Sequence, residues 1–300
     1  MIISHGDADG IISACVAMKK LGLREPLFFS TSTSLKKLLC RTIAKLERLP
    51  NLYIFDISPS PITLKLASIF PKTVWIDHHI PNPLEAPENV ELVLDAEAES
   101  AAKLVAKYFG VELELVEIAN QIDTNSVVDD DAHFLRELVS AVKWKYRGRE
   151  LGRKLRSMTK VLATKGLEYF EKKDSILTLL KEYEQWKEKM LEEIMQKLRV
   201  EEVGEKKVAI LETHQGHPVY ILTEKLKDHE SKPFDIIALL IHGLRENRIF
   251  TRIELRTHTQ EDVFRIASSL GGGGHKFASG VSIKGFMGAN DFLEHLRNMF

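Results

Sequence analysis

Acidic and histidine side chains follow several short apolar stretches of the chain. The set consists of His5, Asp7 and Asp9, then Asp56, then Asp77, His78 and His79, and finally Asp123. Without a cation these carboxylates would repel one another, and their pKa values would rise. Oxygen and imidazole ligands in this mixture suit Mn²⁺, Mg²⁺ or Zn²⁺. The set exceeds what one ion with open positions can use, so we expect two ions bridged by a shared carboxylate, an arrangement that serves displacement at a phosphoryl group.

Helix capping is the structural alternative for some of these residues. Asp7 or Asp9 could cap a helix that begins near Gly10, because aspartate is a preferred N-cap residue. Residues 77–79 could form a polar loop. Three separate apolar stretches that all end in aspartate are harder to explain in this way, so we favour the metal centre.

The elements that must position these residues alternate between strands and helices. Short apolar strands are expected at 1–4, 27–30, 52–55, 74–76 and 91–94. Helical spacing appears at 11–21, 35–49, 62–69 and 100–109. This alternation is typical of a doubly wound, mostly parallel α/β sheet. Ligands bind beyond the carboxyl ends of the strands in such a sheet, so we expect the aspartates to meet at one edge.

The charge is distributed unevenly along the chain and predicts three parts. Lys and Arg against Asp and Glu number 12 and 18 in residues 1–130, 17 and 11 in 131–200, and 13 and 14 in 201–300. The first part is the expected metal-binding domain, and the second has helical spacing throughout and reads as a connector. In the third part we expect a smaller α/β domain with strands at 208–212, 218–223, 234–241, 249–256 and 281–286 and a helix at 261–270.

The composition fits a globular protein without a membrane span. Of the 300 residues, 44% are hydrophobic and 28% are charged, as expected for a chain with a substantial core. No apolar run is long enough to cross a bilayer, and the N-terminus lacks the features of a secretion signal. Cys15 and Cys40 are the only cysteines, which argues against a disulfide framework and favours the reducing cytoplasm.

A run of four glycines followed by histidine occupies residues 271–275. It is neither a Walker loop nor a dinucleotide fingerprint, because no Gly-Lys-Ser/Thr follows and the run comes after a helix. A helix stop would explain only the first glycine. Gly273 and Gly274 would let a ligand approach the backbone, where N–H groups can hold an anion. We expect His275 to add a hydrogen bond, and Arg256, on a neighbouring strand, to hold a phosphate or stack on a base.

The stretch 143–160 is strongly basic, with eight Lys or Arg residues against one Glu. Basic side chains neutralise phosphates and aromatic rings stack on bases, so the mixture suits single-stranded nucleic acid. A solvated helix face whose aromatic residues pack inward is the alternative. The residues that we expect to contact nucleic acid are Lys143, Trp144, Lys145, Arg147 and Arg149.

These motifs resemble those of the DHH phosphoesterase superfamily. The similar segments are SHGDADG at 4–10, FDIS at 55–58, IDHH at 76–79 and QIDTN at 121–125. Near the other end, SSLGGGGHKFASG at 268–280 resembles the signature of the DHH-associated C-terminal domain, and IELRT at 253–257 resembles its substrate-binding arginine strand. The order and spacing of the motifs agree over nearly the whole chain.

The resemblance implies a phosphodiesterase or phosphatase that depends on manganese or magnesium. The metal ligands would be Asp7, Asp9, Asp56, His78 and Asp123, with Asp56 as the bridge. His79 would contact a phosphate oxygen, and Arg256, Gly273, Gly274 and His275 would hold the nucleotide. His5 stands two residues before the first aspartate of its motif, whereas several relatives have their histidine four residues before it. Metal ligation and phosphate contact both stay open for His5.

We therefore expect a RecJ-like exonuclease that uses two divalent ions, Mn²⁺ or Mg²⁺. It would hydrolyse single-stranded RNA or DNA to 5′-mononucleotides, in the 3′ to 5′ direction, and could work with replication or repair proteins. One alternative is a small-nucleotide phosphatase or oligoribonuclease of the NrnA kind. A second is a non-catalytic replication scaffold, although the ligand set looks intact. A family II pyrophosphatase is disfavoured because that family has a different C-terminal domain without the glycine-histidine motif.

Overall fold

The computed structural model describes residues 1–79, 84–214, 219–227, 232–245 and 247–300. The chain divides into two compact units, Met1–Tyr183 and Glu184–Phe300. The division at residues 130 and 200 that the charge pattern favours stays a prediction. No helix among the described residues is both long enough and apolar enough to span a membrane.

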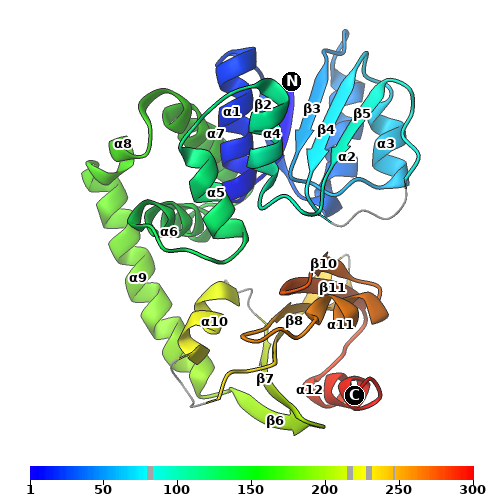
Figure 1. Cartoon of the computed structure of the whole chain (residues 1–300), viewed down its shortest axis with the longest axis vertical. Helices are drawn as coiled ribbons and strands as arrows, with labels where there is room; N and C mark the ends of the chain where they lie inside the picture. The colour runs from blue at the N-terminus through cyan, green and yellow to red at the C-terminus, as the bar shows by residue number, and fades with distance from the viewer. Residues whose placement is uncertain (80–83, 215–218, 228–231, 246) are drawn as a thin grey trace. The chain divides into compact units, whose positions relative to one another are not determined.

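The first unit is built on a five-stranded parallel sheet (Figure 1). Its strand order is β2-β1-β3-β4-β5, which is that of a doubly wound fold with a switch point between β1 and β3. The strands are β1 Ile2–His5, β2 Leu27–Ser30, β3 Leu52–Phe55, β4 Thr73–Asp77 and β5 Val90–Leu94. All five expected strands are confirmed, within a residue at either end.

Helices cover both faces of this sheet. Helices α2 (Ser32–Lys45) and α3 (Pro61–Ala67) pack on one face, where Leu35, Leu39 and Leu64 join a core with Ile3, Ile54 and Trp75. The other helices of the unit are α1 Ala8–Leu21, α4 Ala101–Phe109, α5 Leu115–Asp123, α6 Asp130–Lys145, α7 Gly148–Lys165 and α8 Glu168–Glu171. Helices α4, α5 and α7 contact α1. Helix α9 (Asp174–Met195) continues into the second unit.

The two cysteines lie in different surroundings. Cys15 of α1 is buried and donates its S–H to the Thr159 carbonyl of α7, at 3.2 Å. Burial raises the pKa of the Cys15 thiol far above its ordinary value. Cys40 of α2 is exposed. Both cysteines have free thiols.

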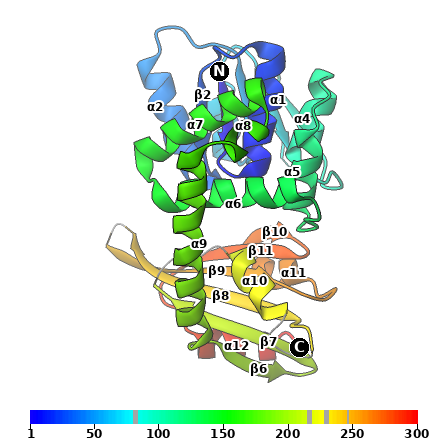
Figure 2. The same ribbon diagram turned by 90° about the vertical axis from the view of Figure 1, so that its left-hand side faces the viewer.

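The second unit contains a mixed sheet of order β10-β11-β9-β8-β7-β6 (Figure 2). Only β7 and β8 are parallel neighbours. The strands are β6 Arg199–Val203, β7 Lys206–Thr213, β8 Ile236–Arg245, β9 Arg248–Arg256, β10 Gly273–His275 and β11 Ala278–Lys284. Helices α11 (Val263–Ser269) and α12 (Ala289–Arg297) cover one face, with Ile266 and Phe292 in the shared core. A smaller α/β domain is therefore confirmed.

One expected strand of this unit is wrong. The stretch 218–223 was expected to be a strand, but helix α10 spans Val219–Lys227, and residue 218 lies outside the described residues. Val219, Leu222 and Leu226 are buried at helical spacing, so the apolar run is one turn of an amphipathic helix. Strands β6 and β10 and helix α12 were not expected from the sequence.

Candidate metal centre and substrate-binding residues

The carboxyl ends of the central strands bring the predicted acidic residues together. Strand β1 ends at His5, β3 ends one residue before Asp56, and β4 ends at Asp77. These three strands are neighbours in the sheet, and parallel strands place their carboxyl ends at the same edge. The site therefore lies beside the switch point of the sheet, where ligands of such folds bind.

Asp56 occupies a constrained position at this edge. Its φ of 57° is in the left-handed region, which few residues other than glycine adopt. The Asp56 N–H donates to the Ile76 carbonyl at 3.0 Å, and the buried Trp75 indole donates to the Ile57 carbonyl at 2.7 Å. These two hydrogen bonds hold the backbone on either side of the Asp56 side chain. Strain of this kind is common at functional sites.

The Asp56 carboxylate belongs to three groups of potential ligands, and two of them consist entirely of predicted metal ligands. It is 3% exposed, and its Oδ2 atom has no hydrogen-bond partner among the described residues. One group consists of His5, Asp7 and Asp56, and the other of Asp9, Asp56 and His78, with ligand atoms within 4.8 Å of one another in each. A carboxylate common to two ligand groups is what a bridged metal pair requires.

The orientation of His78 supports a bound cation. Its Nδ1 lies 3.1 Å from the Ala98 carbonyl, which can only accept, so Nδ1 carries the proton of that hydrogen bond. The other nitrogen, Nε2, lies 3.2 Å from Asp123 Oδ2, 3.6 Å from Asp9 Oδ2 and 3.9 Å from Asp56 Oδ1. A neutral ring would direct a lone pair at three carboxylates. A divalent ion between these acceptors removes the conflict, so the residues present fit a metal.

Burial and mutual repulsion disturb the acidic residues of the site. Desolvation, followed by the charge of Asp123, raises the pKa of Asp9 to about 7. Desolvation and the charge of Asp7 raise the pKa of Asp123 to about 7 and that of Asp56 well above its ordinary value. Such shifts mark functional sites more often than structural ones. Bound divalent ions would neutralise these charges, activate a water molecule and stabilise a phosphoryl group.

Asp7 combines capping with a place in the site. It is the N-cap of α1, and its Oδ1 accepts from the Gly10 N–H at 3.1 Å. Its Oδ2 lies 2.5 Å from His5 Nδ1. Burial opposes ionisation of Asp7, but the charge and hydrogen bond of His5 outweigh it and hold the pKa of Asp7 well below its usual range. The capping role considered for Asp7 is therefore present, and its second oxygen remains beside Asp56.

The close turn that carries these residues requires glycine at position 10. A Cβ atom there would lie 2.3 Å from the His5 carbonyl oxygen. The buried Ser4 hydroxyl donates to the Gly10 carbonyl at 2.6 Å. Gly10 thus allows α1 to begin directly above the end of β1, which places Asp7 and Asp9 over the strand end.

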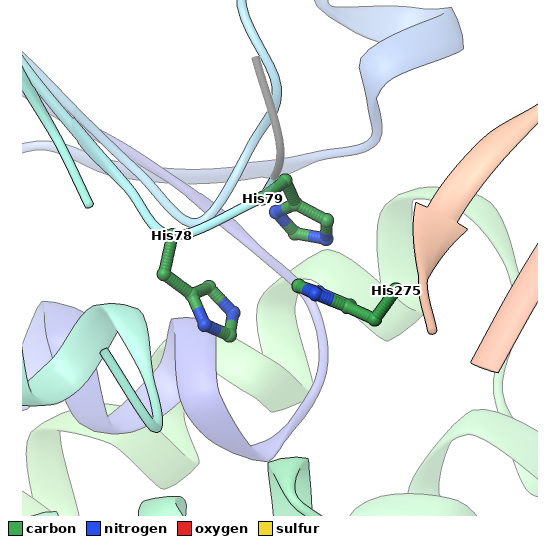
Figure 3. A group of neighbouring side chains, drawn as sticks. All are labelled: His78, His79 and His275. Atoms are coloured by element: carbon green, nitrogen blue, oxygen red, sulfur yellow. The ribbon is translucent and has the colours of Figure 1, made fainter. Parts of the chain in front are cut away.

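Asp77 belongs to the site; the sequence placed it in the acidic set without assigning it a role as a ligand or in substrate binding. Its Oδ1 accepts from His79 Nδ1 at 2.7 Å, and it forms a third possible ligand group with Asp56 and His79. Burial lowers the pKa of His79, but the hydrogen bond and charge of Asp77 prevail and raise it to about 9. Figure 3 shows the His78 and His79 rings beyond β4, with centroids 5.1 Å apart. The position of Asp77 at the end of an apolar strand could have identified it from the sequence.

In the second unit, the predicted substrate residues share one row of the sheet. Ala278 of β11 pairs with His275 of β10 on one side and with Arg256 of β9 on the other. Directly paired residues point to the same face, so His275 and Arg256 flank Ala278. The expectation that Arg256 lies on the strand next to the glycine run is corrected, because β11 lies between them. The third labelled residue of Figure 3 is His275.

The glycines of this run serve different purposes. A Cβ at Gly272 would lie 2.4 Å from the Gly280 carbonyl oxygen, and one at Gly274, whose φ is +130°, would lie 2.6 Å from that of Ala278. A Cβ at Gly273 would meet nothing within 4 Å. Packing and backbone conformation therefore explain Gly272 and Gly274 but not Gly273, which leaves room for a ligand.

Alanine substitutions should separate these two roles. We expect Gly274→Ala to destabilise the second unit by more than about 2 kcal/mol through strain and steric overlap. Gly273→Ala should change the free energy of unfolding by less than about 0.5 kcal/mol and weaken nucleotide binding about tenfold. Thermal unfolding and nucleotide titration of both variants measure these effects. Unchanged binding by Gly273→Ala would exclude a ligand at this position.

The basic residues at the end of α6 have unequal surroundings. Lys143 is exposed, and its charge contributes to the lowered pKa of Asp7. Lys145 pairs with Glu182 of α9 at 2.5 Å, and the half-buried Trp144 ring contacts Tyr183. Arg147 donates to the Lys143, Trp144 and Tyr146 carbonyls at the end of the helix. Arg149, at the start of α7, is exposed. Trp144, Lys145 and Arg147 thus have contacts within the protein, and their contact with nucleic acid stays a prediction.

Comparisons with known proteins identify similar structures. Neither a protein-family model nor a curated protein sequence gives a significant match. The pGpG-specific phosphodiesterase PggH from Vibrio cholerae has 15% sequence identity and a TM-score of 0.57, with 94% of this chain and 92% of that chain covered. Exonuclease RecJ bound to manganese has 15% identity and a TM-score of 0.53, covering 99% and 89%. An exopolyphosphatase-related protein from Bacteroides fragilis has 14% identity and a TM-score of 0.53, covering 99% and 91%.

At 14% and 15% identity the likeness concerns the fold, and it extends over nearly the whole of this chain. The resemblance to the DHH phosphoesterase superfamily rests on the motifs at the two ends of the sequence. The chain shares the fold of these three solved structures.

Proposed function

We propose that the protein is a metal-dependent exonuclease that hydrolyses single-stranded RNA or DNA to 5′-mononucleotides, working in the 3′ to 5′ direction. The observation that carries the proposal is the buried Asp56 carboxylate shared by two ligand groups. In-line displacement at a phosphodiester is the reaction that a bridged pair of divalent ions supports best. A manganese-bound exonuclease with the same fold adds support for Mn²⁺.

In this proposal the residues of the two units have different roles. Asp7, Asp9, Asp56, His78 and Asp123 hold the ions, and His5 completes the group around Asp7 or contacts the phosphate. His79, oriented by Asp77, donates a hydrogen bond to a phosphate oxygen. In the second unit, Arg256 and His275 bind the terminal nucleotide, and Gly273 leaves room for its close approach.

A second candidate is an enzyme that acts on oligonucleotides of two to a few residues. It is favoured by the internal bonds of Lys145, Arg147 and Trp144, which reduce the surface available for a long strand. The similarity to a phosphodiesterase specific for the dinucleotide pGpG points the same way. Both candidates use the same metal centre, so substrate length separates them.

Digestion of end-labelled oligonucleotides tests the proposal. Matched RNA and DNA strands of two, five and twenty nucleotides, each labelled at one end, are incubated with Mn²⁺ and with chelator. The exonuclease should release labelled mononucleotides first from 3′-labelled twenty-nucleotide strands, and only with metal. Cleavage confined to strands of two to five nucleotides would establish the second candidate. No hydrolysis of any strand with Mn²⁺ or Mg²⁺ would reject both.

The exposed basic residues should contribute to binding of long strands, and the internally bonded ones should not. We expect Lys143→Ala with Arg149→Ala to reduce the slope of log affinity against log salt by about 1.4, because each phosphate contact with a single strand contributes about 0.7. Lys145→Ala with Arg147→Ala serves as the matched control and should leave the slope unchanged. Fluorescence anisotropy with a catalytically inactive background measures both. Slopes in both double variants equal to that of the unmodified protein would show that neither pair contacts phosphate.

A further inference from the structure

Two proposed ligands, His78 and Asp9, are bound by a short segment that carries no metal ligand itself. The segment consists of residues 98–102, at the start of α4. The Ala98 carbonyl accepts from His78 Nδ1. The Ala101 and Ala102 N–H groups each donate to one oxygen of Asp9, both at 2.7 Å. These N–H groups belong to the first turn of a helix, which favours negative charge at that point.

Ser100 holds this segment together. It is fully buried and is the N-cap of α4, where its Oγ accepts from the Lys103 N–H at 3.1 Å. The same hydroxyl donates to Asn120 Oδ1 of α5 at 2.7 Å. Asn120 lies three residues before Asp123, so it is a neighbour of Asp123 on the surface of that helix. One hydroxyl therefore connects the helix that binds Asp9 to the helix that carries Asp123.

We propose that Ser100 is a positioning residue for the metal centre, setting the separation of Asp9 and Asp123 through the start of α4 and through Asn120. The inference rests on the proposed metal site. Cap formation alone would only stabilise α4. The hydrogen bond to Asn120 adds a constraint between α4, whose N–H groups bind the Asp9 carboxylate, and α5, which carries Asp123. Loss of partners that orient metal ligands commonly lowers metal affinity about 10- to 100-fold.

Ser100→Ala tests this inference against a matched control. Ser60 is also an N-cap serine, in α3, and its hydrogen bonds run to Thr63 rather than to the site. Both alanine variants should lower the melting temperature of the metal-free protein. Calorimetric titration with Mn²⁺ should show about a tenfold or greater loss of affinity in Ser100→Ala only. Equal affinities in the two variants would overturn the proposal.

Two further variants keep the test decisive if Ser100→Ala is poorly folded. Asn120→Ala leaves the cap of α4 intact and removes the connection between α4 and α5, together with an exposed hydrogen bond to Glu117, so it should also weaken Mn²⁺ binding. Ser100→Thr retains the hydroxyl and should restore most of the affinity. Unaltered Mn²⁺ affinity in Asn120→Ala would contradict the connection between the helices. If the unmodified protein bound no Mn²⁺ or Mg²⁺, the proposed function itself would fail, and the two failures are thus distinguished.

Discussion

Asp56→Asn should abolish hydrolysis and tight metal binding while making the metal-free protein more stable. The variant removes the carboxylate that the group with His5 and Asp7 shares with the group that contains Asp9 and His78. We expect activity to fall by about 10³-fold or more. It also removes a buried carboxyl group that lies among other carboxylates and whose Oδ2 atom has no hydrogen-bond partner among the described residues. Relief of this repulsion should add roughly 1–2 kcal/mol, a rise in melting temperature of about 2–8 °C. Calorimetric titration with Mn²⁺ and thermal unfolding in chelator measure the two effects.

The left-handed backbone at position 56 makes asparagine the informative substitution. Asparagine adopts positive φ more readily than alanine, so it removes the charge without adding strain. Asp56→Ala should lose metal binding equally but be about 1–2 kcal/mol less stable than Asp56→Asn, the usual cost of this conformation for a residue with a Cβ. Two tight Mn²⁺ sites surviving in Asp56→Asn would show that Asp56 is not the bridge.

His275→Ala and Asp123→Asn should fail on different sets of substrates. An oligonucleotide must be held so that the scissile phosphate is correctly placed, whereas a small activated phosphodiester needs little holding. We expect His275→Ala to lose about 10²-fold in kcat/KM on oligonucleotides but to retain hydrolysis of bis(p-nitrophenyl) phosphate within about threefold. Asp123→Asn should lose about 10²-fold or more on both. Steady-state kinetics of both variants on both substrates provides the comparison.

The hydrogen bonds and exposure of each residue determine which substitution removes its function without disturbing the fold. Asp9 is less suitable than Asp123, because removing its carboxylate would leave the Ala101 and Ala102 N–H groups without their partner. Phe277, exposed in the turn after His275, provides the control for the second unit, and Phe277→Ala should affect neither substrate by more than about threefold. Loss of the small-substrate activity in His275→Ala would place His275 in the chemical step.

The sequence predicted the first unit well because its signals are local and agree with one another. Buried parallel strands appear as short apolar runs, and serine or threonine caps at Thr31, Ser60 and Ser100 mark the starts of three helices. The second unit contains weaker signals. Strand β10 consists of glycine and histidine and forms only because β11 pairs with it. The apolar run in α10 fits a strand by itself, and only the helical spacing that continues to Leu226 distinguishes it from one. Short apolar runs of this kind are ambiguous.

The side chains of the candidate site could be predicted from the sequence, but the backbone groups that orient them could not. Aspartates at strand ends indicated where carboxylates would gather, and the structure places them within reach of shared ions. The groups that orient them were not predictable, because the Ala98 carbonyl and the Ala101 and Ala102 N–H groups are backbone atoms that any residue could supply. Charge counting likewise could not reveal that Lys145 pairs with Glu182, since that partner lies far along the chain.

The two thiols differ in exposure, so a spectroscopic label can be attached selectively to one of them. Cys40 is exposed on α2, whereas Cys15 is buried and its thiol resists ionisation, and only the thiolate reacts with alkylating reagents. A maleimide dye or nitroxide would therefore attach at one position of the unmodified chain. Paramagnetic Mn²⁺ in the first unit would quench or broaden the signal of such a label. Metal occupancy could then be followed continuously in every variant without introducing another cysteine.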